Sequence, residues 1–316
     1  MGCLRYQMVA YLFAGQGSQY VGMGKDLYEF FPESKAIFDK ADQVLGFSLS
    51  RLCFAGAPDM FKTTSISQPA ILTVGMAAFE AFKARVEIKP AFMAGLSLGE
   101  YTALIAAGSL TFADGLRLVR RRAELMDEAA QRFPGKMAAV LDLPLEKIKD
   151  ICLKSQAEIA NMNAPGQIVI SGWKEAVEQA KDLCIEAGAK RVVDLEVSGG
   201  FHSSLMFEAS ADLKLLLENT PISLPSTPVI SNYTALPQYK VAQIAENLVY
   251  QMYSPVRWEQ SLRFMLSQGV NKFFEFGPGK VLKGLMRRID ENVQVVNIEK
   301  REDILALVSG ELKDAS

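Results

Sequence analysis

Short runs of consecutive apolar residues recur along the chain, and longer stretches with apolar residues three and four positions apart separate them. Uninterrupted apolar runs are typical of strands in a parallel sheet that is covered on both faces, whereas the three-and-four spacing predicts amphipathic helices. The predicted strands begin at Val9, Ala91, Thr227, Lys272 and Val293, and the predicted helices cover 68–84, 112–130, 203–219 and 260–267. This alternation of strands and helices predicts an α/β domain.

The middle of the chain follows a different order of elements. From Met137 to Val197 the pattern predicts strand, helix, strand, strand, helix and strand, which is the βαββαβ order of a ferredoxin-like module. We therefore predict an α/β-hydrolase-like large domain with a mainly parallel sheet, formed by residues 8–135 and 199–310. The ferredoxin-like subdomain is predicted as an insertion at residues 136–198.

The composition limits the kinds of partner and location. The 316 residues include 34 Lys and Arg against 36 Asp and Glu, so the net charge of −2 predicts no general attraction to nucleic acid or to an anionic membrane. The apolar runs are shorter than the roughly 20 residues that span a bilayer, and the first residues lack the pattern of a signal peptide. We expect a cytoplasmic protein that acts as a monomer.

The cysteines lack the spacing of a metal site, and the sequence alone leaves open a disulfide between two of them. Cys3, Cys53, Cys152 and Cys184 are far apart, and the chain has a single histidine, so the spacing argues against a zinc site. We interpret the four thiols as small apolar side chains in a reducing compartment.

A candidate nucleophile lies in the sequence Gly95-Leu96-Ser97-Leu98-Gly99. This GxSxG pattern follows a predicted strand and precedes a predicted helix at 100–107, a context in which a sharp turn exposes the serine hydroxyl. The alternative is a glycine-rich turn whose serine only caps the helix. The strand and helix on either side favour Ser97 as a nucleophile.

A serine hydroxyl needs a base, and His202 is the one histidine in the chain. A lone histidine is more often a packed or surface residue than a catalytic one. His202 follows Gly199-Gly200, however, at the point where the chain returns from the insertion to the domain that carries Ser97. We therefore pair Ser97 with His202.

A serine that attacks a carbonyl carbon also needs N–H donors for the developing oxyanion. The Leu98 N–H follows the nucleophile directly, and a second donor could come from the glycine-rich loop 15–19 after the first strand. This loop lacks both phosphate-binding spacings, GxxxxGK[ST] and GxGxxG.

These motifs together resemble a known family. The sequence is similar to the malonyl-CoA:acyl carrier protein transacylases of fatty acid synthesis and to the acyltransferase domains of polyketide synthases. The matching segments run through most of the chain in family order: AGQGSQYVGMG, SQPAIL, GLSLGEYTAL, RRRAELM, NAPGQIVISG, FHS, YSPVRW and FEFGPGKVL.

The resemblance implies transfer of a malonyl group from malonyl-CoA to the phosphopantetheine thiol of acyl carrier protein, with no cofactor. It implies that Ser97 carries the acyl group, His202 is the base, and the Gln16 and Leu98 amides form the oxyanion hole. Counting from the serine, the malonate-binding arginine falls on Arg122. Its neighbours Arg120 and Arg121 are the alternatives.

Three further residues take roles from the resemblance. Gln251 would present an amide carbonyl that orients His202, or would be an ordinary polar helix residue. Asn163 would contact substrate or hold a conformation, or would serve the turn before Pro165. Phe201, next to the histidine, is the residue that accompanies malonyl in the polyketide relatives.

Carrier proteins are acidic, so the resemblance also implies a basic rim beside the site. The candidates are basic residues near the last strand of the insertion and after the GPG turn: Lys190, Arg191, Lys280, Lys283, Arg287 and Arg288. The alternative, which we expect for most of them, is an ordinary solvated side chain.

The alternative function is a serine thioesterase or esterase of the α/β-hydrolase type, which shares GxSxG. Such enzymes have their histidine near the chain end and an acidic residue between serine and histidine. His202 is followed by more than a hundred residues without another histidine. The sequence therefore favours transfer over hydrolysis.

Overall fold

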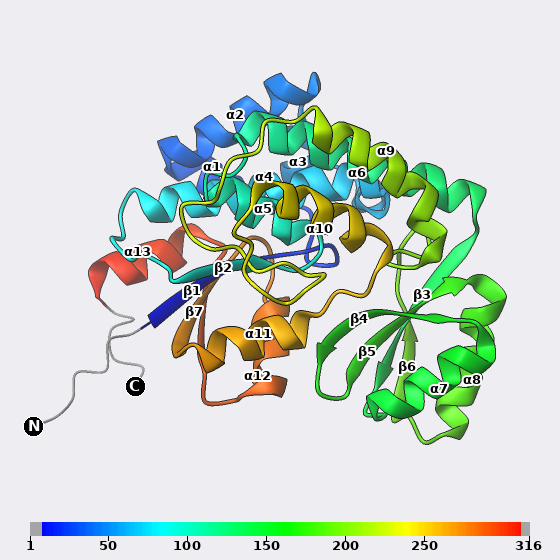
Figure 1. The fold of residues 1–316 in the computed structure, drawn as a ribbon. Helices are drawn as coiled ribbons and strands as arrows, with labels where there is room; N and C mark the ends of the chain where they lie inside the picture. The colour runs from blue at the N-terminus through cyan, green and yellow to red at the C-terminus, as the bar shows by residue number, and fades with distance from the viewer. Residues whose placement is uncertain (1–7, 311–316) are drawn as a thin grey trace, which may run out of the picture.

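The computed structural model describes residues 8–310, and Cys3 lies outside the described residues. Two separate sheets organise the chain (Figure 1). The larger sheet is parallel throughout, in the order β2-β1-β7-β8. Its strands are β1 (Met8–Phe13), β2 (Phe92–Gly95), β7 (Val270–Phe276) and β8 (Gln294–Ile298).

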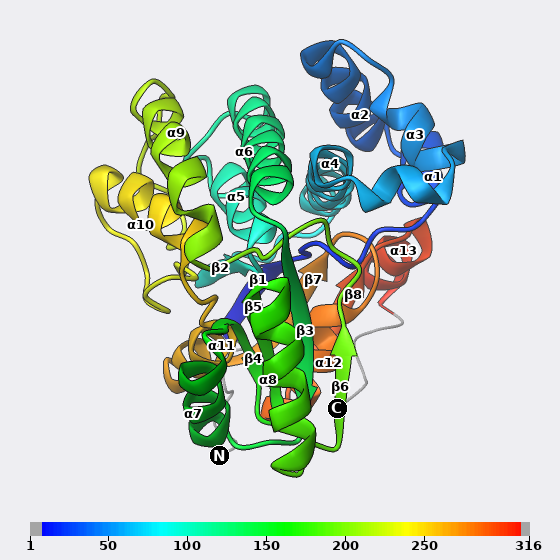
Figure 2. The ribbon, with the colours of Figure 1, turned by 90° about the vertical axis from the view of Figure 1, so that its right-hand side faces the viewer.

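Helices cover both faces of this sheet (Figures 1 and 2). Successive residues of β1 alternate between two cores: Tyr11 and Phe13 pack with α4 and α5, whereas Ala10 and Leu12 pack with α11 and α12. The helices are α4 (Thr64–Lys83), α5 (Leu98–Ala106), α11 (Trp258–Ser267) and α12 (Val281–Ile289). Burial on both faces explains why the strands read as unbroken apolar runs.

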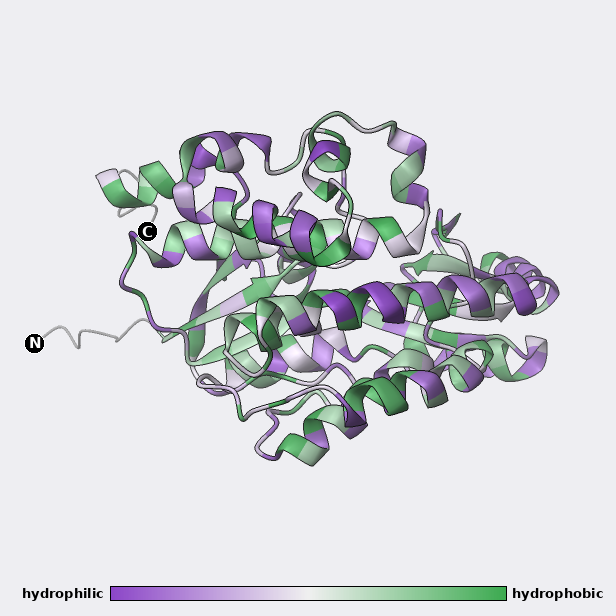
Figure 3. Ribbon diagram, turned by 90° about the horizontal axis from the view of Figure 1, so that it is seen from above, coloured by the Kyte–Doolittle hydropathy of each residue, from purple (hydrophilic) through white to green (hydrophobic). Residues whose placement is uncertain are grey.

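The remaining helices of the large part of the chain lie around this sheet, and α6 packs against α4, α5 and α9. They are α1 (Lys25–Phe30), α2 (Pro32–Leu45), α3 (Leu49–Ala55), α6 (Phe112–Arg132), α9 (Phe207–Glu218), α10 (Val241–Tyr253) and α13 (Arg301–Ser309), with 3₁₀ turns η1 (Pro58–Lys62) and η2 (Ser204–Met206). Hydrophobic and hydrophilic residues alternate along these helices (Figure 3). Within residues 8–310, no helix is both long and apolar enough to span a bilayer.

The smaller sheet is antiparallel, in the order β4-β5-β3-β6. Its strands are β3 (Gly135–Leu141), β4 (Glu158–Ala164), β5 (Gln167–Trp173) and β6 (Arg191–Asp194). Two helices of the same segment accompany them, α7 (Leu145–Ser155) and α8 (Lys174–Glu186). One face packs its alternate residues, such as Ala138 and Ile170, against α7 and α8. The opposite face, with Met137 and Val169, borders the cavity described below. Because successive side chains of a strand point to opposite faces, one face of the sheet forms a core with the helices and the other lines the cavity.

The α/β prediction, with a parallel sheet and a second sheet in the middle of the chain, is confirmed. The strand predicted from Thr227 is wrong: this segment meets β2 only through an isolated bridge between Met93 and Val229. Pro228 has no N–H to give to a ladder, and the chain then folds back, with Ile230 bridging Pro237. The helix predicted at 203–219 is divided into η2 and α9.

The three cysteines that the structure describes, Cys53, Cys152 and Cys184, are buried and form no disulfide with one another. Cys53 belongs to the main core, whereas Cys152 on α7 and Cys184 on α8 belong to the core between these helices and the small sheet. Their surroundings fit the interpretation of small apolar side chains.

Candidate active site

Ser97 occupies the sharp turn between β2 and α5, with φ 52° and ψ −102°. Few non-glycine residues adopt a positive φ, so the surroundings must hold this conformation. The flanking glycines are required by packing: a Cβ on Gly95 would lie 2.0 Å from the Gly99 carbonyl carbon, and a Cβ on Gly99 would lie 2.2 Å from the Phe13 oxygen. The GxSxG spacing therefore reflects backbone contacts at the end of the parallel sheet.

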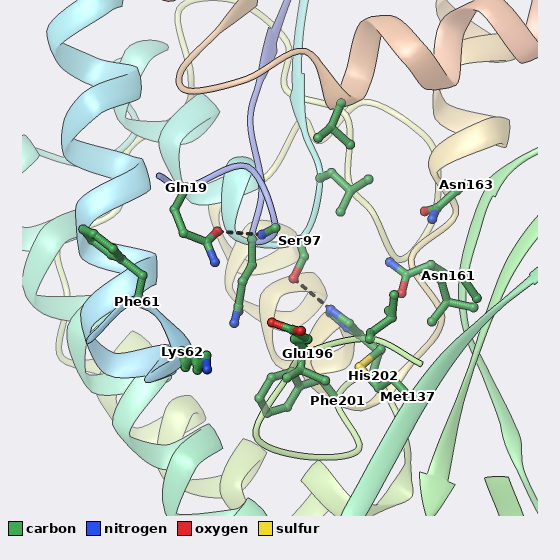
Figure 4. Close-up of a pocket in the computed structure, with 18 of the residues that line it drawn as sticks. Gln19, Phe61, Lys62, Ser97, Met137, Asn161, Asn163, Glu196, Phe201 and His202 are labelled. Carbon is green, nitrogen blue, oxygen red and sulfur yellow. Dashed lines mark hydrogen bonds between the residues drawn. The ribbon is translucent and has the colours of Figure 1, made fainter. Parts of the chain in front are cut away.

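The structure brings His202 to Ser97 although 105 positions separate them. The Ser97 Oγ lies 2.8 Å from His202 Nε2 (Figure 4), and both side chains are buried. His202 Nδ1 lies 2.7 Å from the main-chain oxygen of Gln251. Because a carbonyl can only accept, Nδ1 carries the proton and Nε2 of the neutral ring is free to accept the serine proton.

The environment keeps this imidazole neutral. Burial, reinforced by the positive charge of Arg122, lowers the pKa of His202 to about 4, against the opposing effect of the hydrogen bond to Gln251. A neutral imidazole at pH 7 is the form that can accept a proton. The geometry and the charge state therefore suit general-base chemistry at Ser97.

Arg122 on α6 reaches the same serine. Its guanidinium donates to Ser97 Oγ at 3.1 Å, to Gln68 Oε1 at 2.7 Å and to Gln251 Oε1 at 3.1 Å, and it lies over the Tyr101 ring. The side chain is fully buried, and no carboxylate lies within ion-pair distance of it among residues 8–310. A fixed, buried guanidinium without a direct counter-ion is suited to receiving an anionic group.

The neighbouring arginines point elsewhere. Arg120 contacts Glu124 and the Ser65 carbonyl, and Arg121 pairs with Glu124 and Glu128 on the outer face of α6. Of the three consecutive arginines, Arg122 alone contacts Ser97, since one helical step of 100° separates a buried position from an exposed one.

The two predicted oxyanion donors lie on adjoining segments. Leu98 is the first residue of α5, and Gln16 follows β1. These segments touch at Gly15, where a Cβ would lie 2.4 Å from the Leu96 oxygen. Among residues 8–310, neither the Gln16 nor the Leu98 N–H has a hydrogen-bond acceptor. Free N–H groups beside a nucleophile can bind a developing negative charge.

A cavity of about 750 Å³ opens beside Ser97 between the two sheets. Gln16, Ser97 and His202 line it, and the small sheet supplies the amide side chains of Asn161 and Asn163. Figure 4 shows both asparagines on the side of the cavity where His202 lies. Asn163 is buried, and its Oδ1 has no partner among the described residues. Phe201 also lines the cavity. Within the same part of the chain, no cluster of His, Cys, Asp or Glu could hold a metal ion.

Residues 10–301 match the family described as acyl transferase domain. The chain belongs to this family. It is 46% identical over 301 residues to the malonyl CoA-acyl carrier protein transacylase of Bacillus subtilis, covering 94% of this chain and 95% of that protein. The resemblance inferred from the motifs is thereby confirmed.

Solved structures of this acyltransferase family share the fold. A malonyl-transacylase in complex with its type II PKS acyl-carrier protein aligns with a TM-score of 0.93 at 37% identity, covering 96% of this chain and 100% of that one. The acyl-carrier-protein S-malonyltransferase of Bartonella henselae aligns with a TM-score of 0.92 at 38% identity, covering 96% and 99%.

In this acyltransferase the contact from Gln251 to the histidine is made by the main chain. The Gln251 side-chain amide instead accepts from Arg122 and donates to the Ser97 oxygen and to Glu100. Residue identity at 251 thus affects the arginine and the serine turn more directly than the histidine. The sequence-based prediction named Gln251 without distinguishing its main-chain carbonyl from its side-chain carbonyl.

Sequence reasoning missed three residues that contact the site. Gln68 accepts from Arg122 and donates to Gln16 Oε1, Glu100 accepts from Gln251, and Asn232 accepts from the Ser97 N–H. Burial raises the pKa of Glu100 to about 7, opposed by hydrogen bonds from Asn232, Gln251 and Gln238.

Gln68 and Glu100 lie within motifs that carry the resemblance. Asn232 has no local signal, since it is the last residue of the segment predicted as a strand from Thr227.

The predicted basic rim is divided between the two parts of the molecule. Lys190 lies beside β6 of the small sheet and Arg288 on α12 of the large part, and the two side chains approach opposite oxygens of Asp142 at 3.7 and 3.6 Å. Arg191, Lys283 and Arg287 are exposed nearby in sequence. Because Val281 and Leu285 of α12 line the cavity, this helix borders the opening to Ser97.

Proposed function

We propose that this protein transfers a malonyl group from malonyl-CoA to the phosphopantetheine thiol of an acyl carrier protein through a malonyl ester on Ser97. The observation that carries the proposal is the pair of contacts on one oxygen atom. Ser97 Oγ has a neutral histidine at 2.8 Å and a buried arginine at 3.1 Å. The first contact suits removal of the hydroxyl proton, and the second suits binding of an anionic acyl group at the same place.

In the first half-reaction, Ser97 Oγ attacks the thioester carbonyl carbon while His202 Nε2 takes the hydroxyl proton. The carbon–sulfur bond then breaks, and the proton passes from His202 to the departing CoA sulfur. The Gln251 main-chain oxygen accepts from Nδ1, so it stabilises the imidazolium that forms between these steps. The Gln16 and Leu98 N–H groups would bind the carbonyl oxygen while it is negatively charged.

In the second half-reaction, the carrier thiol gives its proton to His202, and its sulfur attacks the ester carbonyl. The bond from that carbon to Oγ breaks, and Ser97 recovers its proton from His202. Throughout both steps the malonyl carboxylate would pair with Arg122, which lacks a direct counter-ion. An unpaired carboxylate would be costly to bury in this site, so Arg122 favours malonyl over a neutral acyl group. No cofactor is needed for this sequence of steps.

The remaining assignments concern the cavity and its rim. Asn163, with a free buried oxygen, and Phe201 are proposed to contact the substrate, and both line the cavity. Lys190, Arg191, Lys283 and Arg287 are proposed to meet the acidic carrier protein. Their support is the position of α12 at the cavity and the approach of Lys190 and Arg288 to one carboxylate. The cytoplasmic location and the monomeric state stay predictions.

We also propose the finer description of the fold. The strand order β4-β5-β3-β6, with α7 and α8 on one face, supports a ferredoxin-like subdomain at residues 136–198. The parallel sheet with the serine turn after β2 supports an α/β-hydrolase-like large domain at 8–135 and 199–310.

Intact-protein mass spectrometry tests the function. Brief exposure to malonyl-CoA should add one malonyl group to the wild type and none to Ser97→Ala, since within residues 8–310 no other hydroxyl has this pair of contacts. Adding a holo-acyl carrier protein should discharge the adduct to the carrier thiol faster than water does. A malonyl adduct on Ser97→Ala would remove the serine from its role, and faster discharge to water would favour the thioesterase alternative.

A further inference from the structure

A buried carboxylate, that of Glu100, lies directly behind the serine turn. Glu100, two residues after the start of α5, is fully buried and has no Lys or Arg within ion-pair distance among residues 8–310. Its Oε2 accepts from the Asn232 N–H at 2.9 Å and from Gln251 Nε2 at 2.8 Å, and its Oε1 accepts from Gln238 Nε2 at 3.2 Å. Burial of a carboxylate is unfavourable, so these three donors are what makes the position tolerable.

Asn232 connects Glu100 to the backbone of the turn. Its Oδ1 accepts from the Ser97 N–H at 2.6 Å, and its Nδ2 donates to the Gly95 oxygen at 2.8 Å. The side chain of Asn232 therefore spans both ends of the turn, while its own N–H is held by Glu100. Ser97 has a positive φ, a conformation that persists only where its surroundings hold it. The hydrogen bonds of Asn232 therefore help to fix the direction of the Ser97 hydroxyl.

Gln251 connects Glu100 to the other two groups of the site. Its Nε2 donates to both Glu100 and the Ser97 oxygen, and its Oε1 accepts from Arg122. Its main-chain oxygen accepts from His202 Nδ1. Glu100 therefore reaches Ser97 through Asn232 and through Gln251, each of which bonds to both residues. Gln251 also links Glu100 to His202 and to Arg122.

We propose that Glu100 is a positioning residue of the acyl transfer: through Asn232 and Gln251 it holds the Ser97 turn, the His202 ring and the Arg122 guanidinium in one arrangement. The proposal rests on the proposed function of Ser97 and His202. Glu100 itself touches no substrate, so its loss should slow the chemical step more than it weakens binding of malonyl-CoA. A misplacement of about 1 Å at reacting atoms costs on the order of 10²-fold in rate.

The test compares Glu100→Ala with Glu100→Gln. Alanine removes the acceptor and frees three buried donors, so kcat for malonyl transfer should fall about 10²-fold while KM for malonyl-CoA stays within about threefold. Glutamine has the same length, and its Oε1 can still accept from Asn232 and Gln251. Its NH₂ group can donate to Gln238 once the amides of Gln238 and Asn247, which bond to each other at 3.0 Å, both rotate. Glutamine should therefore recover most of the lost kcat.

Glu275 provides a matched control. It is also a fully buried carboxylate that accepts three hydrogen bonds, from the N–H groups of Leu282 and Lys283 and from Asn297, but none of these partners bonds to Ser97, His202 or Arg122. Glu275→Ala should lower the thermal midpoint as Glu100→Ala does, with kcat per folded molecule within about twofold of wild type. Equal kcat values for the two alanine variants would overturn the proposal, since Glu100 would then act on stability alone.

Two further measurements keep the proposal open to refutation. If Glu100→Ala does not fold, Asn232→Ala takes its place, and a wild-type kcat in that variant would refute the bracing of the turn. The rate at which an uncharged fluorophosphonate labels Ser97 requires the serine and its base but neither malonyl nor a carrier. That rate should also fall about 10²-fold in Glu100→Ala. If wild type fails to accept malonyl, the proposed function fails, and the labelling rate still decides the role of Glu100.

Discussion

The buried surroundings of Ser97 and the exposed basic rim differ in how many arrangements each permits. Around Ser97, Arg122 and Gln251 are fully enclosed, and their side chains have several partners fixed by the fold. On the rim, Lys190 is 79% exposed and approaches Asp142 only at 3.7 Å. A buried polar group that loses its partner cannot turn to water, whereas an exposed one can. Changes near Ser97 should therefore have large and specific effects, and changes on the rim small and salt-dependent ones.

The largest effect in this comparison is expected at His202. His202→Ala should leave a folded protein whose acylation by malonyl-CoA is slowed by at least about 10²-fold, the low end of what a positioned base supplies. Rapid-quench measurement of the malonyl-enzyme gives the rate, and circular dichroism checks the fold. A rate near that of wild type would show that the contact to Ser97 is not used.

Arg122 should separate charged from neutral donors. Arg122→Ala should lower kcat/KM for malonyl-CoA by the equivalent of about 2–5 kcal/mol, the range for breaking a buried charged pair, with little loss for acetyl-CoA. Arg122→Lys should recover only part, since lysine keeps the charge without the two-pronged geometry. Kinetics with both donors give the comparison, and Arg121→Ala, on the exposed face of the same helix, is the matched control. An alanine variant that keeps its malonyl preference would place the carboxylate elsewhere.

The basic rim should respond to charge and to salt. Replacing Lys190 and Arg191 together by Glu should weaken use of the carrier protein by about tenfold, mainly in the association rate, and spare transfer to pantetheine. The loss should shrink as salt rises, because exposed charges are screened beyond roughly 8 Å at physiological ionic strength. Lys35 and Lys40 on α2, both exposed, give a control charge reversal. Equal losses with both acceptors would exclude a docking role.

The smallest expected change is with pH. Because His202 has a pKa lowered to about 4, the neutral base should persist as the pH falls from 7.5 to 5.5, and the acylation rate should change less than about twofold. At the ordinary value of about 6.5, only about one molecule in ten would be neutral at pH 5.5. Glu100, with its pKa raised to about 7, takes up a proton in this range, so the profile is compared with that of Glu100→Gln. A tenfold drop in both would contradict the buried, neutral histidine.

Much of the fold could be predicted from short segments of sequence, because the burial of a strand or helix determines which of its positions are apolar. The unbroken apolar run of β1 and the alternation in β3 and β5 follow from having two covered faces or one. The segment at Thr227 was misread because its apolar run is buried without being in a sheet: Val229 and Ile230 are fully buried, yet Pro228 and the reversal that follows prevent a ladder. A hydrophobic pattern predicts burial more directly than it predicts hydrogen bonding.

The sequence by itself determined the family, the α/β architecture with its inserted second sheet, and the chemical candidates Ser97 and His202 with a run of three arginines, since a sharp serine turn, a single histidine and consecutive arginines can be seen in the sequence alone. Only the tertiary structure decided which of three arginines reaches the serine, which carbonyl of Gln251 meets the histidine, and that Glu100 and Asn232 stand behind the turn. These contacts join residues 25 to 154 positions apart. These contacts form because buried polar groups must be hydrogen-bonded to whatever partners the packed chain brings near them. A short-range sequence pattern does not show which partners those are.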